Sequence, residues 1–328
     1  FINNKNINNY FNIYKNSYDI INNIASIHNT QNDIIDINEN LIVPYGVETF
    51  ISKVLNEETG INYDSPNYLT VNNLKERLDR LTSNNLILGS SFNLNYNNQE
   101  SFFDENFFQI RWKIEFIGNL LNAILNNLNY SKNSSNKNEI DGVAPSQYFK
   151  SELDYIKHWK IGIKKIIAFH FFSGIAIPYG NSNNIPFSRS FFSGGSNDNR
   201  AWKVYKLGPG SSDNINEFNE ANFKVSLNLE YRYPLFGKLN GGIFVDMGNI
   251  WNVFDDIKDE KFKFDGIKDL NELAIGSGFG LRYDFDFFVL RFDTGFKTYN
   301  PSLEKDKRWM SEFSLNKAVF NIGINYPF

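Results

Sequence analysis

From about residue 85 onward, apolar and polar residues alternate with a period of two over long runs. In FKVSLNLEYRY at 223–233, the odd positions are apolar or aromatic, whereas the even positions carry Lys, Ser, Asn, Glu and Arg. Strict alternation of this kind predicts β-strands with one apolar and one polar face. The same pattern recurs in FQIRWKIEF at 108–116, FVLRFDTGFK at 288–297 and AVFNIGINYPF at 318–328.

The length and spacing of these runs favour a membrane barrel over a soluble sandwich. A tilted strand needs about 9–11 residues to cross a bilayer, and the runs are close to that length. Long and short gaps alternate, as in barrels with short periplasmic turns and long outer loops. Residues 45–84 lie in one long gap, where we expect short helices. About twelve strands are predicted, at roughly 6–14, 17–28, 33–43, 85–97, 107–118, 148–159, 165–177, 222–233, 241–251, 273–284, 287–297 and 319–328. The predicted fold class is all-β, a transmembrane antiparallel up-and-down β-barrel.

The composition and charge of the chain exclude several kinds of partner and site. The chain has 328 residues, a formal net charge of −4 and no cysteine. The charge gives no argument for a nucleic-acid partner, and the lack of cysteine excludes disulfides, thiolate metal sites and a cysteine nucleophile. No apolar run is long enough for a membrane-spanning helix. We expect no cofactor and no metal.

Three segments in the second half of the chain resemble the bacterial surface antigen family, the BamA/TamA-type outer-membrane assembly barrels. They are FFSGGSNDNRAWKVYKLGPGS at 191–211, LNLEYRYPLFGKLNGGIFVDMGNIWN at 227–252 and GSGFGLRYDFDFFVLRFDTGFK at 276–297. LGSSFNLNYNNQ at 88–99 and IAIPYGNSNNIPFSRSFFSGGS at 175–196 are similar to the TamA-like branch. The resemblance covers residues 85–328 well and residues 1–84 loosely.

The resemblance implies a barrel of sixteen strands in a bacterial outer membrane. In that family five strands follow the arginine-containing loop, and five predicted strands follow it here. We therefore expect residues 1–328 to be a C-terminal barrel domain. The first strands and the periplasmic repeat domains of such proteins would then lie upstream of Phe1.

In the resembling family the long loop folds into the lumen, and its arginine pairs with acids there. The alternation agrees, because Glu230 and Asp246 both face the polar side and become diagonal neighbours if the turn centres near Gly237. Two carboxylates that close repel unless a cation lies between them, and the planar fork of Arg200 could bridge both. The alternative is that Glu230 and Asp246 are ordinary solvated charges. Gly194, Gly195, Trp202 and Gly208 are expected to shape the loop, unless it is a flexible surface loop.

One departure from the family lies in this loop. The usual Arg-Gly-aromatic triplet is Arg200-Ala201-Trp202 here, and alanine lacks the easy access of glycine to positive φ.

The last predicted strand, 319–328, would close the barrel against its first strand. Phe320 and Phe328 fall on the apolar face, and a final strand ending in Phe resembles the signal that directs barrels to insertion. The alternative is that Phe328 has no such role. Gly323 and Pro327 are expected to weaken the ladder at this seam, because proline removes a donor.

The leading functional hypothesis is a non-enzymatic factor that inserts or exports client proteins through this lateral seam. A strand edge can bind an unfolded client through main-chain hydrogen bonds. The partners would be the outer-membrane bilayer, unfolded outer-membrane or secreted clients, and periplasmic or inner-membrane assembly proteins. The alternatives are a passive pore or secretion channel and an enzyme barrel, although the three histidines, His28, His158 and His170, come with no nucleophile motif or metal spacing.

Overall fold

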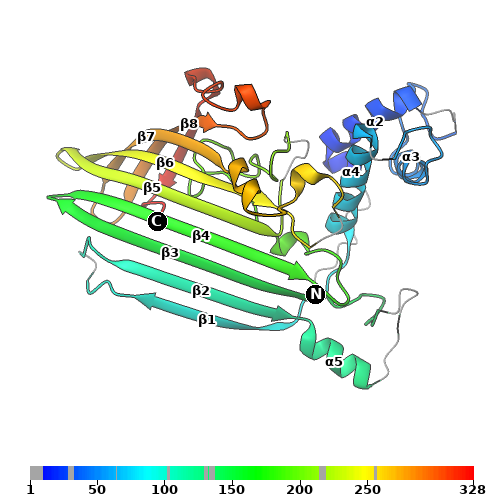
Figure 1. The fold of residues 1–328 in the computed structure, drawn as a ribbon, viewed down its shortest axis with the longest axis horizontal. Coiled ribbons are helices and arrows are strands. Elements are labelled where there is room, and N and C mark those ends of the chain that lie inside the picture. Colours follow the sequence, from blue (N-terminus) through cyan, green and yellow to red (C-terminus); the bar gives the residue numbers. More distant parts are fainter. Residues whose placement is uncertain are drawn as a thin grey trace.

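The computed structural model describes residues 10–28, 33–63, 65–101, 104–128, 132, 137–213, 219–254 and 257–328. Its main feature is a nine-stranded sheet with the order β1 to β9, in which every neighbour is consecutive and antiparallel (Figure 1). The strands are β1 Gly89–Asn97, β2 Phe108–Ile117, β3 Tyr148–Gly162, β4 Lys165–Pro178, β5 Phe223–Phe236, β6 Leu239–Trp251, β7 Ala274–Asp284, β8 Val289–Tyr299 and β9 Val319–Ile324. This is the up-and-down topology predicted from the alternation.

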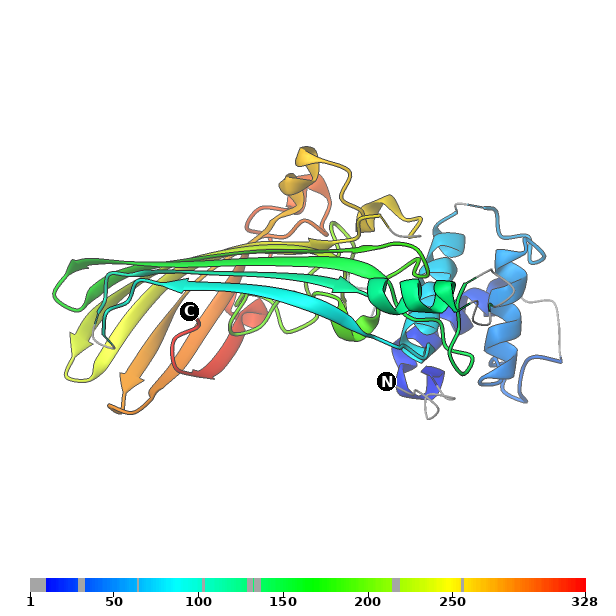
Figure 2. The same cartoon turned by 90° about the horizontal axis from the view of Figure 1, so that it is seen from below.

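The sheet curves into a partial barrel, and its concave side is here called the lumen (Figure 2). Along β6, Ile243 and Val245 are exposed on the outer face, while Phe244 and Asp246 are buried on the lumen side. An apolar exterior and a polar interior are typical of strands surrounded by lipid. None of the described helices is long and apolar enough to cross a membrane.

Connections alternate in length between the two ends of the sheet, as predicted. The short ones are 163–164, 237–238 and 285–288, whereas 118–147, 179–222, 252–273 and 300–318 are long. The long connections carry α5 Asn119–Asn127 and the 3-10 helices η1 Phe187–Arg189, η2 Glu260–Phe262, η3 Ile267–Glu272, η4 Lys305–Lys307 and η5 Leu315–Lys317. All long connections leave the same end of the sheet, here called the long-loop end.

The three strands predicted before residue 44 are wrong wherever the structure describes them. The chain forms α1 Tyr10–Ile13 and α2 Lys15–His28, and residues 33–43 make only an isolated bridge between Ile35 and Leu41. Residues 1–9 and 29–32 lie outside the described part. In α2 the buried Ile21, Ile24 and Ala25 follow helical spacing, which outweighs the weak alternation.

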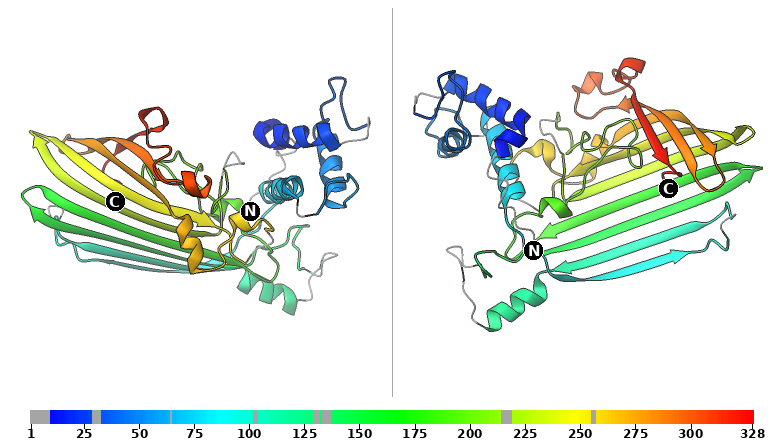
Figure 3. Two further views of the ribbon diagram at one scale, coloured as in Figure 1. Left: turned by 45° about the horizontal axis from the view of Figure 1, so that its top comes forward. Right: turned by 180° about the vertical axis from the view of Figure 1, so that it is seen from behind.

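The short helices predicted within 45–84 are confirmed as α3 Tyr45–Leu55 and α4 Pro66–Thr82. Ser65 caps α4 by accepting from the Tyr68 amide, and Pro66 occupies its first turn. The four helices α1–α4 pack around an apolar core that includes Ile21, Phe50 and Val71. This helical unit sits at the long-loop end of the sheet (Figure 3).

Candidate functional site

The predicted loop, residues 193–211 and here called the arginine loop, belongs to the long connection between β4 and β5. Two glycines allow its tight path. A Cβ on Gly194, where φ is 93°, would lie 2.3 Å from the Lys203 carbonyl oxygen, and one on Gly208, where φ is 77°, would lie 2.3 Å from Asn249 Oδ1. The structure also gives Gly195 a positive φ and buries Trp202. The backbone at these positions therefore needs glycine.

Arg200 lies fully buried against the lumen face, where it contacts the two predicted acids. Its Nε and Nη2 donate to Asp246 Oδ2 and Oδ1 at 2.8 and 2.9 Å, and its Nη1 donates to Glu230 Oε2 at 2.5 Å. The backbone N–H of Arg200 adds a bond to Asp246 Oδ2 at 3.0 Å. The register pairs Glu230 with Phe244, so Asp246 is its diagonal neighbour. One guanidinium group thus bridges two carboxylates from β5 and β6.

The cluster extends beyond the three residues that the sequence singled out. Asp293 on β8 lies 3.7 Å from Arg200 Nη1 and 2.8 Å from Arg282 Nη2. Arg282 and Arg232 also reach Glu230, at 3.1 and 2.9 Å. Alternation places Asp293 on the lumen face, but only the course of the loop brings Arg200 close to it.

Burial acts to lower the pKa of Arg200, but the charge and hydrogen bonds of Asp246, together with Glu230 and Asp293, outweigh burial. The net effect raises the pKa of Arg200 above its usual value. The guanidinium therefore stays charged, and the acids around it are compensated rather than left as isolated buried charges.

The arginine loop approaches the sheet at positions where the strands carry glycine. A Cβ on Gly295 would lie 2.4 Å from the Arg200 carbonyl oxygen, and one on Gly276 would lie 2.6 Å from the Ala201 Cβ. On the other side, the Arg200 guanidinium stacks over the Phe244 ring at 3.5 Å. Ala201 is buried and has no positive φ, so the family's glycine is not required at this position.

Asp198 forms a second attachment point that the sequence did not indicate. Its Oδ2 accepts from Ser193 Oγ and the Gly194 amide at 2.7 Å each, and its Oδ1 accepts from Ser226 Oγ at 2.8 Å. Burial acts to raise the pKa of Asp198, but Lys224, 3.2 Å away, and these hydrogen bonds outweigh it and lower the pKa. Asp198 therefore fixes the start of the loop as an ionised side chain.

The loop also contacts the last two strands. Asn321 Nδ2 on β9 donates to the Arg200 carbonyl oxygen at 2.9 Å. Arg291 on β8 donates to the Ser196 carbonyl oxygen at 2.8 Å and to Asn197 Oδ1 at 2.7 Å. The arginine loop thus links β5 and β6 with the strand at the edge of the sheet.

The predicted terminal strand is shorter than expected. It ends at Ile324, because Asn325 adopts φ 64° and turns the chain. Phe320 is exposed on the outer face, and Gly323 pairs with Arg291 within the ladder. Pro327 follows the strand, so the prediction that it removes a ladder donor is wrong.

Phe328 does not continue the apolar outer face, and that expectation is also wrong. Its carbonyl oxygen accepts from Arg232 Nη2 at 3.0 Å, and its ring stacks on His170 at 5.3 Å. Arg232 and His170 belong to the lumen face. The chain after Ile324 therefore folds inward, which leaves β9 with six residues.

In the part of the chain that the structure describes, no metal-binding cluster forms around the histidines. His170 lies 3.4 Å from Asp154 Oδ2 and 3.1 Å from Asn228 Oδ1, whereas His158 pairs with Ala168 in the ladder.

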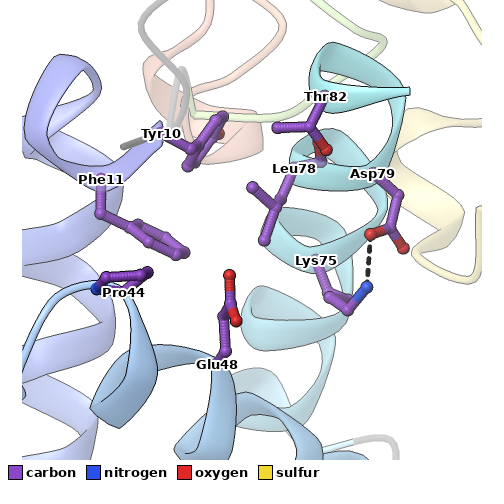
Figure 4. A pocket seen from close by; sticks show the side chains of 8 residues that line it. All are labelled: Tyr10, Phe11, Pro44, Glu48, Lys75, Leu78, Asp79 and Thr82. Carbon is purple, nitrogen blue, oxygen red and sulfur yellow. Dashed lines mark hydrogen bonds and ion pairs between the residues drawn. The ribbon is translucent and has the colours of Figure 1, made fainter. Parts of the chain in front are cut away.

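A cavity of about 560 Å³ lies within the helical unit, away from the arginine cluster (Figure 4). Its lining residues are Tyr10, Phe11, Pro44, Glu48, Lys75, Leu78, Asp79 and Thr82.

None of the curated proteins matches the chain. Among solved structures, BamA from Haemophilus ducreyi lacking POTRA domains 1-3 is similar, with 13% identity and a TM-score of 0.44, over 73% of this chain and 41% of that one. This chain therefore spans less than half of that solved chain. Residues 2–328 match the Omp85 superfamily domain, and the chain belongs to that superfamily, which includes the BamA/TamA-type barrels that its sequence resembles.

Proposed function

We propose that this chain is the barrel part of a factor that inserts or exports client proteins through a lateral seam at β9. Its place would be a bacterial-type outer membrane, and no covalent step is involved. The clients would be unfolded outer-membrane or secreted polypeptides, delivered by periplasmic or inner-membrane partners. Membership of the Omp85 superfamily supports this class of function.

The observation that carries the proposal is the shortness of β9, whose six residues limit the number of ladder hydrogen bonds at the seam. The Asn325 amide donates to the Val289 carbonyl oxygen, so odd-numbered residues of β9 direct their backbone groups toward β8. Even-numbered residues, such as Ile322, direct theirs the opposite way. Among the described strands none pairs with that side of β9. A client strand could add there through main-chain hydrogen bonds, which do not depend on client sequence.

The arginine loop would hold this edge in place. Asn321 on β9 donates to the Arg200 carbonyl oxygen, while the Arg200 side chain is fixed on β5 and β6. Because β9 is only six residues long, we expect such a contact from the lumen to stabilise it. We propose that the Arg200 cluster keeps the seam strand positioned while clients pass.

Site-directed crosslinking tests the proposal, because residues 1–328 contain no cysteine that would compete with an introduced one. Ile322→Cys places a thiol on the β9 edge, and Ile243→Cys places one on the same outer face in the middle of the sheet. The probe is an unfolded β-barrel polypeptide with one cysteine in its last strand, offered to the full-length protein in membranes. We expect a mixed disulfide at position 322 and not at 243.

Equal capture at both positions would mean that clients meet the outer face nonspecifically. Capture at neither position during active assembly would contradict the seam mechanism. Ion conduction without client capture would favour the passive pore.

A further inference from the structure

Residues 300–318, here called the outer segment, connect β8 to β9 and extend beyond the long-loop end of β8 (Figure 1). Trp309 forms a bridge with Tyr299, and the Met310 amide donates to the Thr298 carbonyl oxygen at 2.9 Å. Tyr299 in turn pairs with Ile275, whose side chain lies in the outward-facing row of β7. The segment thus continues the ladder of β8 where β9 has not yet begun.

Ring contacts place the aromatic side chains of this segment on the outer face. Trp309 packs against Tyr299 with ring centroids 4.8 Å apart, and Phe313 stacks on Phe296 at 4.8 Å. Phe296 also contacts Phe279, which is exposed on the outer face of β7. The segment therefore extends the apolar outer surface beyond the end of the strands.

The apolar side chains of the outer segment are exposed, although hydrogen bonds and an ion pair attach the segment to β8. Trp309 is 59% exposed and Leu315 is 70% exposed, and Met310 and Phe313 are exposed beside them. The attachment is polar: Glu312 accepts from Asn300 Nδ2 at 2.7 Å and lies 3.2 Å from Lys297 Nζ. Exposed apolar side chains that the fold holds together are typical of binding surfaces.

The exposed patch adjoins the lipid-facing rows, and cationic residues stand next to it. Lys305, Lys307 and Arg308 lie within the four residues before Trp309, where Lys307 pairs with Glu304 and Asp306 follows Lys305. Tryptophan and long basic side chains are enriched at the level of lipid headgroups, because one end is apolar and the other polar. Beside it, β9 has six residues, fewer than the roughly 9–11 that a membrane strand needs.

We propose that the outer segment is a lipid-binding anchor that inserts Trp309, Met310, Phe313 and Leu315 into the interface of the leaflet at the long-loop end. Its ligand class is the lipid surface of the membrane that surrounds the barrel. There it supplies the apolar height that the short β9 lacks and fixes the membrane level at the edge strand. This inference concerns the position of the segment and does not depend on client transport.

Tryptophan fluorescence tests the position directly. The full-length protein is reconstituted in phosphatidylcholine vesicles whose acyl chains carry bromine near the carbonyl end, and its emission is compared with that in unbrominated vesicles. The Trp309 contribution is the difference between the wild type and Trp309→Phe. We expect bromine to remove most of this contribution, and aqueous iodide to leave it nearly unchanged.

Two other tryptophans calibrate the measurement. Trp159 on the outer face of β3 should be quenched by bromine, and the buried Trp202 should respond to neither quencher. If the Trp309 contribution is insensitive to bromine and falls with iodide, the segment lies in water or against a protein partner, and the inference is overturned. If bromine quenches Trp309 to the same extent in the Leu315→Glu variant, that result would also count against insertion of the patch.

Discussion

The arginine loop and the outer segment are two long connections that leave the same end of the sheet and end up on opposite sides of it. In the arginine loop, Trp202 and Leu207 are each 2% exposed, whereas Trp309 in the outer segment is largely exposed. Hydrophobicity does not separate them, since both contain large apolar residues. The difference lies in what each meets at the sheet.

The arginine loop meets charges and glycines. Its backbone packs directly on Gly276 and Gly295, and Arg200 neutralises acids that would otherwise be buried alone. The outer segment meets the edge and outer face of β8, where Phe296 and Tyr299 offer rings. Its Glu312 also pairs with Lys297, whose ammonium group lies 5.5 Å from the Trp202 ring of the arginine loop. The arginine loop therefore enters the lumen because its charge is compensated there and glycines admit its backbone. The rings of the outer segment pack outside because the exterior of the sheet is apolar.

Reversing the charge of Arg200 should have the largest effect on the position of the arginine loop. Arg200→Glu would add a fourth carboxylate to Glu230, Asp246 and Asp293. Even the loss of one partner from a buried ion pair costs about 3–5 kcal/mol. We expect the loop to leave the lumen and the unfolding midpoint in urea to fall sharply, measured by heat-modifiable gel mobility in detergent. Lys203→Glu, at an exposed position of the same loop, is the matched control. Equal midpoints for the two variants would contradict the proposed role of Arg200.

Blocking the approach of the loop should have a smaller effect. Gly295→Ala puts a Cβ 2.4 Å from the Arg200 carbonyl oxygen, so loop or strand must shift. Forced repacking of this kind costs about 1–3 kcal/mol. The free energy of unfolding should fall by that amount, while Gly162→Ala, whose Cβ meets nothing nearer than 3.4 Å, should change it little. A tolerated Gly295→Ala would mean that the loop is not packed on β8.

The hydrogen bond between the arginine loop and β9 should contribute less to stability than the packing of the loop on Gly295. Asn321→Ala removes the bond to the Arg200 carbonyl oxygen, and one such bond contributes about 1 kcal/mol. We expect faster amide exchange in β9 with little change in β5 and β6. The exposed Asn316→Ala should leave exchange in β9 as in the wild type. Unchanged exchange in β9 on loss of Asn321 would remove the link between loop and seam.

The smallest expected effect is a pH dependence of the outer segment. Burial acts to raise the pKa of Glu312, but its bond from Asn300 and the nearby Lys297 and Lys317 outweigh burial and lower it below the usual 4.5. The attachment is therefore complete above that value and is lost as pH falls through the lowered pKa. Its contribution is under about 1 kcal/mol, because the ion pairs are partly solvated.

Acrylamide quenching of Trp309 in detergent measures this attachment. Quenching should increase as the solution is acidified below pH 4.5, and Glu312→Gln should show the acid level of quenching already at neutral pH. A flat profile in the wild type would show that Glu312 does not hold the segment.

Much of the barrel could be predicted from the sequence because a period of two depends only on neighbouring residues. The strands after residue 85 and the inward direction of Glu230 and Asp246 followed from it. The lumen position of Arg200 came from the family resemblance. Asp198 and Asp293 could not be selected, because their role depends on where the loop backbone runs.

The errors lie where local signals were weak or ambiguous. Residues 10–28 are rich in Asn and Ile, and their helical spacing emerges only with the apolar core that α1–α4 share. At the other end, Asn325 turns the chain at positive φ, which asparagine tolerates better than most residues. That single turn moves Phe328 from the expected outer face to the lumen.

The most direct test of the central claim is whether the arginine loop lies inside the barrel. Asp198 and Ser226 are in hydrogen-bond contact, so Asp198→Cys combined with Ser226→Cys should form a disulfide in the folded protein in membranes. Asp198→Cys with Val225→Cys is the control, since Val225 is the adjacent residue on the outward side of β5. A disulfide in the first pair alone is the predicted result. Free thiols in the first pair that react with a maleimide added from the aqueous phase would place the loop outside the lumen and contradict the account.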